Sequence, residues 1–313
     1  MIPLDDSKIR YSSQSHAGLA GKENQDRFAL KAFLLKEGSR SESVVGIVAD
    51  GLDGHRAGDS AAKLAVDAIY EAIASSQGSQ PNGILEAALL LAGQSILAQS
   101  EAEKAKRGMG STALCAWVID KRLYSAAVGD SRLYLLRGER LRLLNSPDEI
   151  LDAGKGAKDE EPEDSGSVYL GSRLHVDVEL SHAVAGKGNQ SGFQLQANDR
   201  LLLGSKGLFE SLGEERMVKI LGQARIEDVA GKLVQEALDA GAQDNLTALA
   251  IAIPPGRPMP AYRQIALRRR LRLALASFML ILISLLGWYF LAPQIDPSFT
   301  PVSTAINTLT PVP

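Results

Sequence analysis

Cysteine is nearly absent from this chain of 313 residues, which contains Cys115 alone. A single thiol excludes an internal disulfide framework and a zinc site built from several cysteines. Because Cys115 lies in an apolar run, we expect a small buried side chain and not a nucleophile. Excess positive charge is also missing, since the formal net charge of -3 gives no indication of a nucleic-acid surface. The first residues, Met1 to Asp6, contain no apolar run and predict no signal peptide.

Charge is missing altogether from one long stretch near the C-terminus, Leu273 to Ala292, whose 20 residues are apolar or weakly polar. A helix of that length crosses a hydrocarbon core of about 30 Å. The alternative is a buried core helix, which normally carries polar residues on one face. Trp288 and Tyr289 lie near the far end, where aromatic rings favour the membrane interface. Six arginines precede the stretch and no Lys or Arg follows it: Arg257, Arg263, Arg268, Arg269, Arg270 and Arg272.

This charge asymmetry predicts a single-pass membrane protein with the N-terminal domain in the cytoplasm and the C-terminal tail outside. Such a topology fits a bacterial inner or plasma membrane. The chain length suits one large globular domain or two small ones. We expect a domain at 1–253, a juxtamembrane linker rich in Pro and Arg at 254–272, a transmembrane helix at 273–292 and an unstructured tail rich in Pro, Ser and Thr at 293–313.

The domain alternates strand-like and helix-like segments. Apolar residues recur on one helical face over 59–73, 85–96 and 226–238, and the first two of these helices are consecutive. Hairpins with helices gathered in pairs favour antiparallel sheets covered by helices over a parallel sheet. An acidic stretch at 145–167 indicates a solvated loop, with an acidic partner-binding patch as the alternative. The expected strands are 44–49, a β-meander of 112–119, 123–128, 133–136 and 141–144, and then 200–203 and 247–253.

Short acidic signatures border several of these strands. They are Asp50-Gly51, Asp130-Ser131 and Asp244-Asn245. Carboxylates at strand ends beside backbone-exposing glycines suit hard cations such as Mg²⁺ or Mn²⁺. The alternative is turn chemistry, because Asp before Gly or Asn is a good turn former. A related segment carries Lys206 where this pattern would have another acid.

Taken in order, the signatures resemble the metal-dependent protein phosphatase family, also called protein phosphatase 2C. The resemblance covers residues 18–253, and the ordered set is far more specific than any one member of it. It implies an α+β fold, a four-layer αββα sandwich of two antiparallel sheets flanked by helices, to which the C-terminal transmembrane helix is added. The matching segments are Asn24-Gln25-Asp26, Ala49-Asp50-Gly51 with Gly54-His55, Gly108-Met109-Gly110-Ser111-Thr112, Val128-Gly129-Asp130-Ser131-Arg132, Leu201-Leu202-Leu203-Gly204-Ser205 with Gly207-Leu208, and Asp244-Asn245-Leu246-Thr247.

The resemblance further implies two Mn²⁺ or Mg²⁺ ions and a bridging water that attacks phosphoserine or phosphothreonine. Asp50 matches the carboxylate that bridges both metals, and Gly51 matches a backbone carbonyl ligand. Asp244 matches a ligand of one metal, and Asp130 matches an acid linked in some members to a third. Asp26 matches a carboxylate that orients metal-bound water.

Two neighbours of these acids have roles that the resemblance leaves open. Gln25 stands where many members have Glu, and its neutral oxygen still suits a water molecule. His55 is either a structural hydrogen-bonding residue or a general acid.

This chain departs from the family pattern at two positions. The usual phosphate-gripping arginine is replaced by Gly21, and the adjacent Lys22 offers a point charge only. Lys206 replaces a metal-binding carboxylate. An ammonium about 4 Å from a divalent ion is repelled by roughly 8 kcal/mol at an effective dielectric of about 20. Lys206 either takes the place of a cation and pairs with Asp50 and Asp244, or is a solvated surface lysine. The stretch from Asn145 also differs from the family's flap region.

These residues predict a membrane-anchored phosphatase-like protein of phosphoserine and phosphothreonine signalling, in which metal-dependent hydrolysis is weak or lost. One alternative is a fully active serine/threonine protein phosphatase that uses Mn²⁺ or Mg²⁺. The other is a non-catalytic scaffold that binds a phosphoprotein or a kinase. The expected partners are a phosphorylated protein or a serine/threonine kinase, and the membrane through Leu273 to Ala292.

Overall fold

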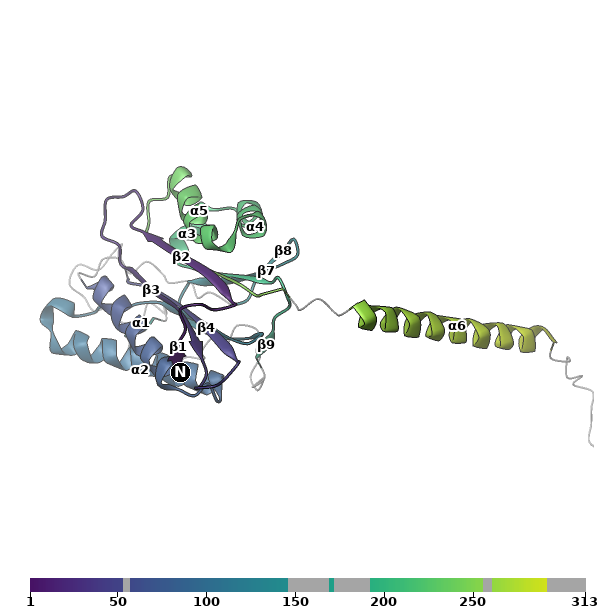
Figure 1. Cartoon of the computed structure of the whole chain (residues 1–313). Coiled ribbons are helices and arrows are strands. Elements are labelled where there is room, and N and C mark those ends of the chain that lie inside the picture. Colours follow the sequence, from purple (N-terminus) through teal and green to yellow (C-terminus); the bar gives the residue numbers. More distant parts are fainter. Residues whose placement is uncertain (53–56, 146–168, 172–191, 256–260, 292–313) are drawn as a thin grey trace, which may run out of the picture. The chain divides into compact units, whose positions relative to one another are not determined.

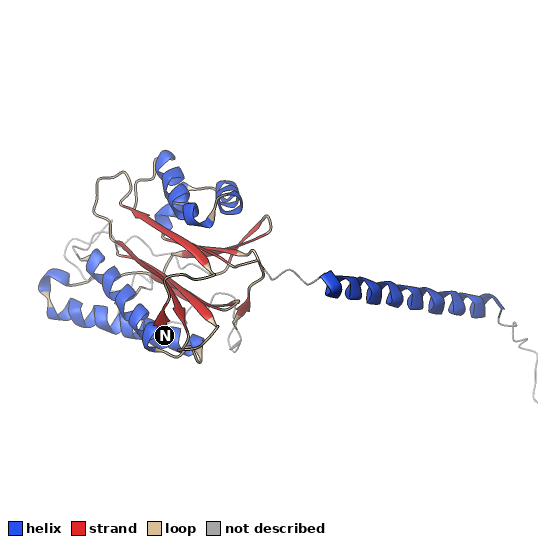
Figure 2. Ribbon diagram, viewed as in Figure 1, coloured by secondary structure: helices blue, strands red, loops and turns tan. Residues whose placement is uncertain are grey.

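The computed structural model describes residues 1–52, 57–145, 169–171, 192–255 and 261–291. The chain divides into two compact units, Met1–Gly256 and Arg257–Pro313. In the first unit two antiparallel sheets stack face to face, and helices cover the outer face of each sheet (Figures 1 and 2). This architecture confirms the predicted αββα sandwich.

One sheet has six strands in the described part of the chain, in the order β1-β3-β4-β5-β6-β9. β4 is buried along nearly its whole length because both of its faces are covered. Ile47 packs toward the helices, while Val48 packs between the two sheets. The strands are β1 (Ile2–Pro3), β3 (Asp26–Leu34), β4 (Glu42–Asp50), β5 (Ala113–Ile119), β6 (Arg122–Val128) and β9 (Phe193–Gln194).

Two long helices, α1 (Gly58–Ser75) and α2 (Pro81–Ala102), cover the outer face of this sheet and confirm the predicted helical periodicity. α2 begins at Pro81, whose fixed backbone angle suits a first helical position. Its Leu85 and Leu89 are buried against the sheet. Among the helices searched over the described residues, α2 has the length and composition to cross a membrane, but it packs here as a core helix.

The second sheet has five strands in the described residues, in the order β2-β11-β10-β7-β8, and short helices cover its outer face (Figure 1). Val229 and Leu233 of the covering layer are fully buried, as their helical spacing predicts. The strands are β2 (Arg10–His16), β7 (Arg132–Arg137), β8 (Arg140–Leu143), β10 (Arg200–Gly204) and β11 (Leu246–Ala252), and the helices are α3 (Lys206–Ser211), α4 (Glu214–Gln223) and α5 (Ile226–Asp239). A 3₁₀ turn, η1 (Lys104–Lys106), follows α2.

The predicted four-stranded meander is wrong, because its two hairpins belong to different sheets. The β5–β6 hairpin lies in the six-stranded sheet, and the β7–β8 hairpin lies in the five-stranded sheet. The chain changes sheet at Gly129, whose φ of +97° is open to glycine but costly for other residues. Asp130 follows directly, so it lies at the junction where the chain passes from one sheet to the other.

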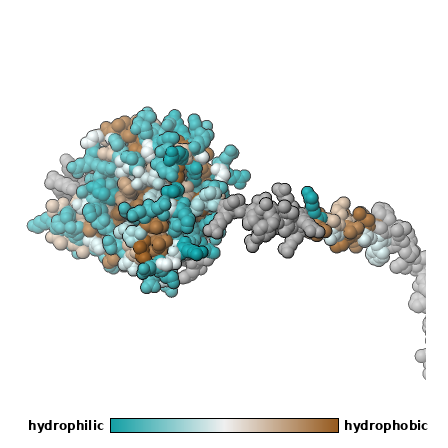
Figure 3. Space-filling model, viewed as in Figure 1, coloured by the Kyte–Doolittle hydropathy of each residue, from teal (hydrophilic) through white to brown (hydrophobic). Residues whose placement is uncertain are grey.

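The second unit contains one helix, α6 (Ala261–Leu291), among its described residues. It begins inside the segment predicted as a linker. The apolar side chains described between Leu273 and Trp288 are exposed, and Figure 3 shows hydrophobic residues along this part of the helix. Several predicted features lie outside the described residues: the last residue of the predicted span, Ala292, the tail, most of the acidic loop, and the pair Gly54-His55.

Candidate active site

The site begins with two carboxylates that face each other across a pair of antiparallel strands. β3 starts at Asp26, β4 ends at Asp50, and the strand register pairs these two residues directly. The residues just before β5 hold the Asp50 backbone in place. The N–H of Asp50 donates a hydrogen bond to Thr112 Oγ1 at 3.0 Å. The Asp50 carbonyl accepts from the N–H of Thr112 at 2.8 Å and from Ser111 Oγ at 3.0 Å. The segment Gly108 to Thr112 therefore fixes where Asp50 points.

Gly51 stands where a side chain cannot fit. A Cβ built on Gly51 would lie 2.2 Å from the carbonyl oxygen of Gly58, the first residue of α1. The close approach brings the N-terminus of α1 against the end of β4. The sequence signal Asp50-Gly51 thus reflects packing between a strand and a helix.

Asp26 is buried and tied to the opposite sheet. Its Oδ2 accepts a hydrogen bond from Thr247 Oγ1 at 2.6 Å and another from Ser205 Oγ at 2.7 Å. Its Oδ1 has no hydrogen-bond partner among the described residues. Burial raises the pKa of Asp26 to about 6, although the hydrogen bonds from Thr247 and Ser205 act in the opposite direction.

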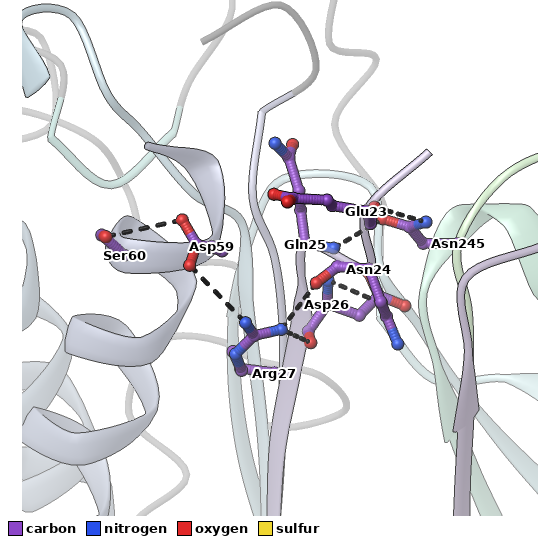
Figure 4. Close-up of polar contacts among 8 residues, drawn as sticks. All are labelled: Glu23, Asn24, Gln25, Asp26, Arg27, Asp59, Ser60 and Asn245. Atoms are coloured by element: carbon purple, nitrogen blue, oxygen red, sulfur yellow. Dashed lines mark hydrogen bonds and ion pairs between the residues drawn. The ribbon is translucent and has the colours of Figure 1, made fainter. Parts of the chain in front are cut away.

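Asp244 lies at the entry to β11 and is exposed, whereas the next residue, Asn245, is buried. Asp244 Oδ1 accepts from the N–H of Asn245 at 2.9 Å. The Asn245 side chain holds the loop that contains Gln25: its Oδ1 accepts from the N–H of Gln25 at 2.8 Å, and its Nδ2 donates to the carbonyl of Glu23 at 3.2 Å (Figure 4). The same Nδ2 donates to the carbonyl of Ala17 at 2.9 Å. Asn245 thereby binds the Asp26 segment to the Asp244 segment.

A second clamp on the same loop comes from Arg27. One of its guanidinium nitrogens donates to the backbone carbonyls of Asn24 at 2.7 Å and Asp26 at 2.8 Å (Figure 4). Another lies 3.7 Å from the carboxylate of Asp59 in the first turn of α1. Arg27 therefore connects the Asp26 segment with the helix that packs on Gly51.

Lys206 is the first residue of α3 and lies close to Asp130. Its Nζ is 3.7 Å from Asp130 Oδ2 and 3.8 Å from Glu210 Oε1. Among the described residues its ion pairs are with these two acids, so the expected pairing with Asp50 and Asp244 is not seen. The Lys206 side chain is 35% exposed, which is compatible with the alternative of a solvated surface lysine.

Four of the predicted acids act on one another. Burial raises the pKa of Asp50 well above its ordinary value, and the nearby charges of Asp26, Asp130 and Asp244 raise it further. Burial also raises the pKa of Asp130, while the Lys206 ammonium opposes that shift. The structure therefore brings the predicted acids into one cluster that would be stabilised by positive charge, and Lys206 supplies part of it.

The acids of the site have the right chemistry to bind a divalent cation, but their arrangement does not form a complete set of ligands. Carboxylate oxygens are the ligands that Mg²⁺ and Mn²⁺ prefer. The buried oxygens Asp26 Oδ1, Asp130 Oδ1 and Gln25 Oε1 all lack hydrogen-bond partners within the described residues. Yet no group of three or more His, Cys, Asp or Glu side chains in the described part of the chain is placed to hold a metal ion. We therefore assign no reaction step to a bound ion.

The position of the expected phosphate clamp carries no cation. Gly21 is exposed, has a φ of +73°, and a Cβ built on it would meet nothing within 4 Å. The adjacent Lys22 is exposed as well. His16, which has no place in the motifs, accepts a hydrogen bond at Nδ1 from the N–H of Gly18 at 3.0 Å.

Sequence reasoning missed the roles of several neutral motif residues. Ser205, Asn245 and Thr247 were each within a quoted motif, but no function was attached to them. A signal was available for Asn245, which directly follows Asp244, and for Thr247, three residues from it, because short polar side chains near an acid are suited to hold a carboxylate. Cys115 is buried in β5, as predicted.

The fold and the acidic cluster define a metal-dependent phosphatase scaffold. A sequence profile described as protein phosphatase 2C matches residues 14–223, and the chain belongs to the protein phosphatase 2C family. It is 30% identical over 258 residues to the serine/threonine phosphatase stp of Listeria monocytogenes serotype 4b, covering 79% of this chain and 92% of that protein.

The serine/threonine protein phosphatase PstP of Mycobacterium tuberculosis is a further relative, 28% identical over 244 residues. The match covers 76% of this chain and 44% of PstP, so the chain spans less than half of that relative. The catalytic domain of PstP, solved in complex with two manganese ions, is 28% identical with a TM-score of 0.61, covering 78% of this chain and 97% of that domain.

Proposed function

We propose that this chain is a membrane-anchored, phosphatase-like protein of phosphoserine and phosphothreonine signalling in which metal-dependent hydrolysis is weak or lost. Its partners are a phosphorylated protein or a serine/threonine kinase. Mn²⁺ or Mg²⁺ is the cofactor of whatever hydrolysis remains, in keeping with the two manganese ions bound by the PstP domain. The single observation that carries the proposal is the ion pair between Lys206 and Asp130.

The charge balance of the cluster supports weak metal binding. Two positive charges are needed to replace one divalent ion, and Lys206 already places one of them beside Asp130. A divalent ion that approached Asp130 would meet the ammonium within a few ångströms, and such repulsion amounts to several kcal/mol at an effective dielectric of about 20. Asp50 and Asp244 remain as candidate ligands, with the Gly51 carbonyl beside them. Their charge suits one weakly held ion better than two.

The phosphate side of the site supports the same view. Gly21 offers no side chain, so this position cannot supply the bidentate grip of an arginine on a phosphoryl group. What the chain keeps is the scaffold: Asp26 and Asp50 are paired across β3 and β4, and the loop between Ala17 and Gln25 is held by Asn245. A phosphorylated segment would meet a formed but electrostatically incomplete site.

The membrane anchor is inferred from α6 and its flanks. The helix carries an uncharged stretch from Leu273 whose described side chains are exposed, with arginines before it and none after it. These features support a single span at 273–292, a cytoplasmic domain at 1–253, a linker at 254–272 and an external tail at 293–313.

The test is a calorimetric Mn²⁺ titration of the full chain in detergent, with hydrolysis of p-nitrophenyl phosphate measured beside it. The expected result is weak binding of at most one ion and little or no turnover. The Asp50→Ala variant is the control that identifies any signal from this site. Binding of two ions accompanied by steady turnover that Asp50→Ala abolishes would instead establish a fully active phosphatase.

A further inference from the structure

Asp26 is held by two hydroxyl groups that come from the other sheet. Thr247 Oγ1 on β11 and Ser205 Oγ, which directly follows β10, both donate to Asp26 Oδ2, at 2.6 Å and 2.7 Å. All three side chains are buried, with Thr247 and Ser205 at 0% exposure and Asp26 at 2%. Since β3 belongs to the six-stranded sheet and β10 and β11 to the five-stranded one, these bonds join the two halves of the sandwich at the site.

The network has a fixed direction. Thr247 gives its only hydroxyl proton to Asp26, so in its 2.9 Å contact with Ser15 Oγ it must accept. Ser15 Oγ in turn accepts from Asn24 Nδ2 at 2.9 Å. Ser205 Oγ accepts from the N–H of Thr247 at 3.0 Å while it donates to Asp26. The chain of protons from Asn24 through Ser15 and Thr247 therefore ends at Asp26, and turning the Thr247 hydroxyl away would cost the buried carboxylate one of its two bonds.

We propose that Ser205 and Thr247 are positioning residues that clamp Asp26 Oδ2 and so keep Asp26 Oδ1 available to the acidic cluster. The asymmetry supports this assignment: Oδ2 accepts two hydroxyl bonds, whereas Oδ1 has no partner among the described residues. A carboxylate that accepted one bond on each oxygen would have both oxygens occupied. With both donors on Oδ2, Oδ1 is left for the interaction of Asp26 with the Asp50 carboxyl group that faces it across the two strands.

Neither Lys206 nor a cation takes part in the clamp, because every donor in it is a neutral side chain or a backbone N–H. The clamp explains why the segments 24–26 and 244–247 carry Asn and Thr together with their acids, and why Ser205 lies in the segment 204–208. The geometric part of the inference stands alone, and its catalytic meaning rests on the proposed function.

The first experiment follows the Asp26 side-chain carbon by NMR in the full chain in detergent, labelled with ¹³C at the aspartate carboxyl. The run is made at about pH 8, where this carboxyl is ionised, and the resonance is identified by its loss in Asp26→Asn. Thr247→Val removes the hydroxyl at nearly constant volume, and Thr247→Ser keeps it. The resonance should shift in Thr247→Val and in Ser205→Ala and return in Thr247→Ser. An Asp26 resonance that stays in place in both hydroxyl-removing variants would overturn the clamp.

The second experiment asks whether the clamp serves the reaction. It uses the Lys206→Asp background, in which an acid stands at the position of the lysine, and measures kcat and KM for p-nitrophenyl phosphate. Thr247→Val should lower kcat by roughly tenfold to a hundredfold with little change in KM, and Thr247→Ser should restore it. Equal kcat in the Val and Ser variants would overturn the positioning role.

The two failures are distinguishable. If Lys206→Asp shows no hydrolysis, the account of Lys206 in the proposed function fails, while the clamp is still decided by the Asp26 resonance. If Lys206→Asp hydrolyses p-nitrophenyl phosphate and adding Thr247→Val leaves the rate unchanged, the proposed function stands and the clamp has no catalytic role.

Discussion

The ammonium of Lys206 lies 3.7 Å from the carboxylate of Asp130, at the junction where the chain crosses from one sheet to the other. Under the proposed function this pair weakens metal binding, because the ammonium of Lys206 places a positive charge beside Asp130, one of the acids whose charge acts on Asp50. Glu210 on the next turn of α3 makes a second contact with Lys206 at 3.8 Å. The partly exposed lysine therefore contacts two acids.

The buried Asp26 predicts a pH dependence of stability in the metal-free protein. Its pKa is about 6 in the folded chain against an ordinary value of 3.8, so the folded chain binds the proton more tightly. Between roughly pH 4 and pH 6 the free energy of unfolding should therefore fall as pH rises, by about 3 kcal/mol from this group. Urea unfolding with chelator at several pH values measures the fall, which Asp26→Asn should reduce. Asp67→Asn, on the exposed face of α1, should leave it unchanged; an identical pH profile for Asp26→Asn and wild type would contradict the assignment.

Asn245 predicts a local effect on the loop that carries Gln25. Asn245→Ala removes three hydrogen bonds and leaves the Gln25 N–H and two carbonyls without partners, at a cost of about 2 to 3 kcal/mol. Hydrogen exchange should rise over residues 17–25. The matched control is Asn145→Ala, which also removes buried backbone contacts, to Leu133 and Ser131. That control should destabilise the chain without raising exchange at 17–25, and equal exchange in the two variants would count against this role of Asn245.

Replacing Gly51 by alanine should cause a steric clash between the end of β4 and the start of α1. In Gly51→Ala the new methyl group would lie 2.2 Å from the Gly58 carbonyl, so β4 and α1 must separate. We expect a loss of about 2 kcal/mol or more, since overpacking of this kind costs 1 to 3 kcal/mol. Gly231→Ala in α5 is the control, because nothing lies within 4 Å of its added Cβ. It should stabilise the helix by about 0.5 to 1 kcal/mol. Chemical denaturation of both variants measures the difference, and a neutral Gly51→Ala would show that the contact relaxes freely.

The proposed membrane anchor can be tested by truncating the chain before and after α6. A chain that ends at Gly256 should leave the membrane fraction, whereas one that ends at Ala292 should stay in it. Fractionation followed by washing with alkaline carbonate separates inserted from peripheral protein. If the chain ending at Gly256 stayed in the washed membrane, α6 would not be the anchor.

The parts of the fold that could be predicted are the helices and strands whose apolar residues repeat with the period of a buried face. α1, α2 and α5 each bury one regular apolar face, and β4, β5 and β11 are covered on both sides. β2 was missed because its sequence, Arg10 to His16, is mostly exposed or partly exposed and shows little alternation. The division of the meander was also missed, because turn signals between strands do not say which sheet the next strand joins. That choice depends on Gly129 and on packing across the sandwich.

The site shows a similar division. The acids Asp26, Asp50, Asp130 and Asp244 were identified from their motifs, and the structure brings them into one cluster. The pair between Lys206 and Asp130 was not identified, because these residues lie 76 positions apart and meet only when the chain has folded. Glu210, in contrast, lies one turn after Lys206 on α3. The Thr247–Asp26 bond joins residues 221 positions apart, and no local pattern encodes such a contact.

The most direct test of the central claim is the Mn²⁺-dependent rate of phosphopeptide hydrolysis by Lys206→Asp relative to wild type, measured on the full chain. We expect Lys206→Asp to bind Mn²⁺ at least roughly tenfold more tightly and to hydrolyse the phosphopeptide faster, since a charge change of two units acts on a nearby ion. Lys206→Met, which removes only the charge, should lie between the two. Lys219→Asp, the same charge change at an exposed site on α4, should match wild type. A wild-type chain that already turns over as fast as Lys206→Asp would contradict the claim that Lys206 weakens the metal site.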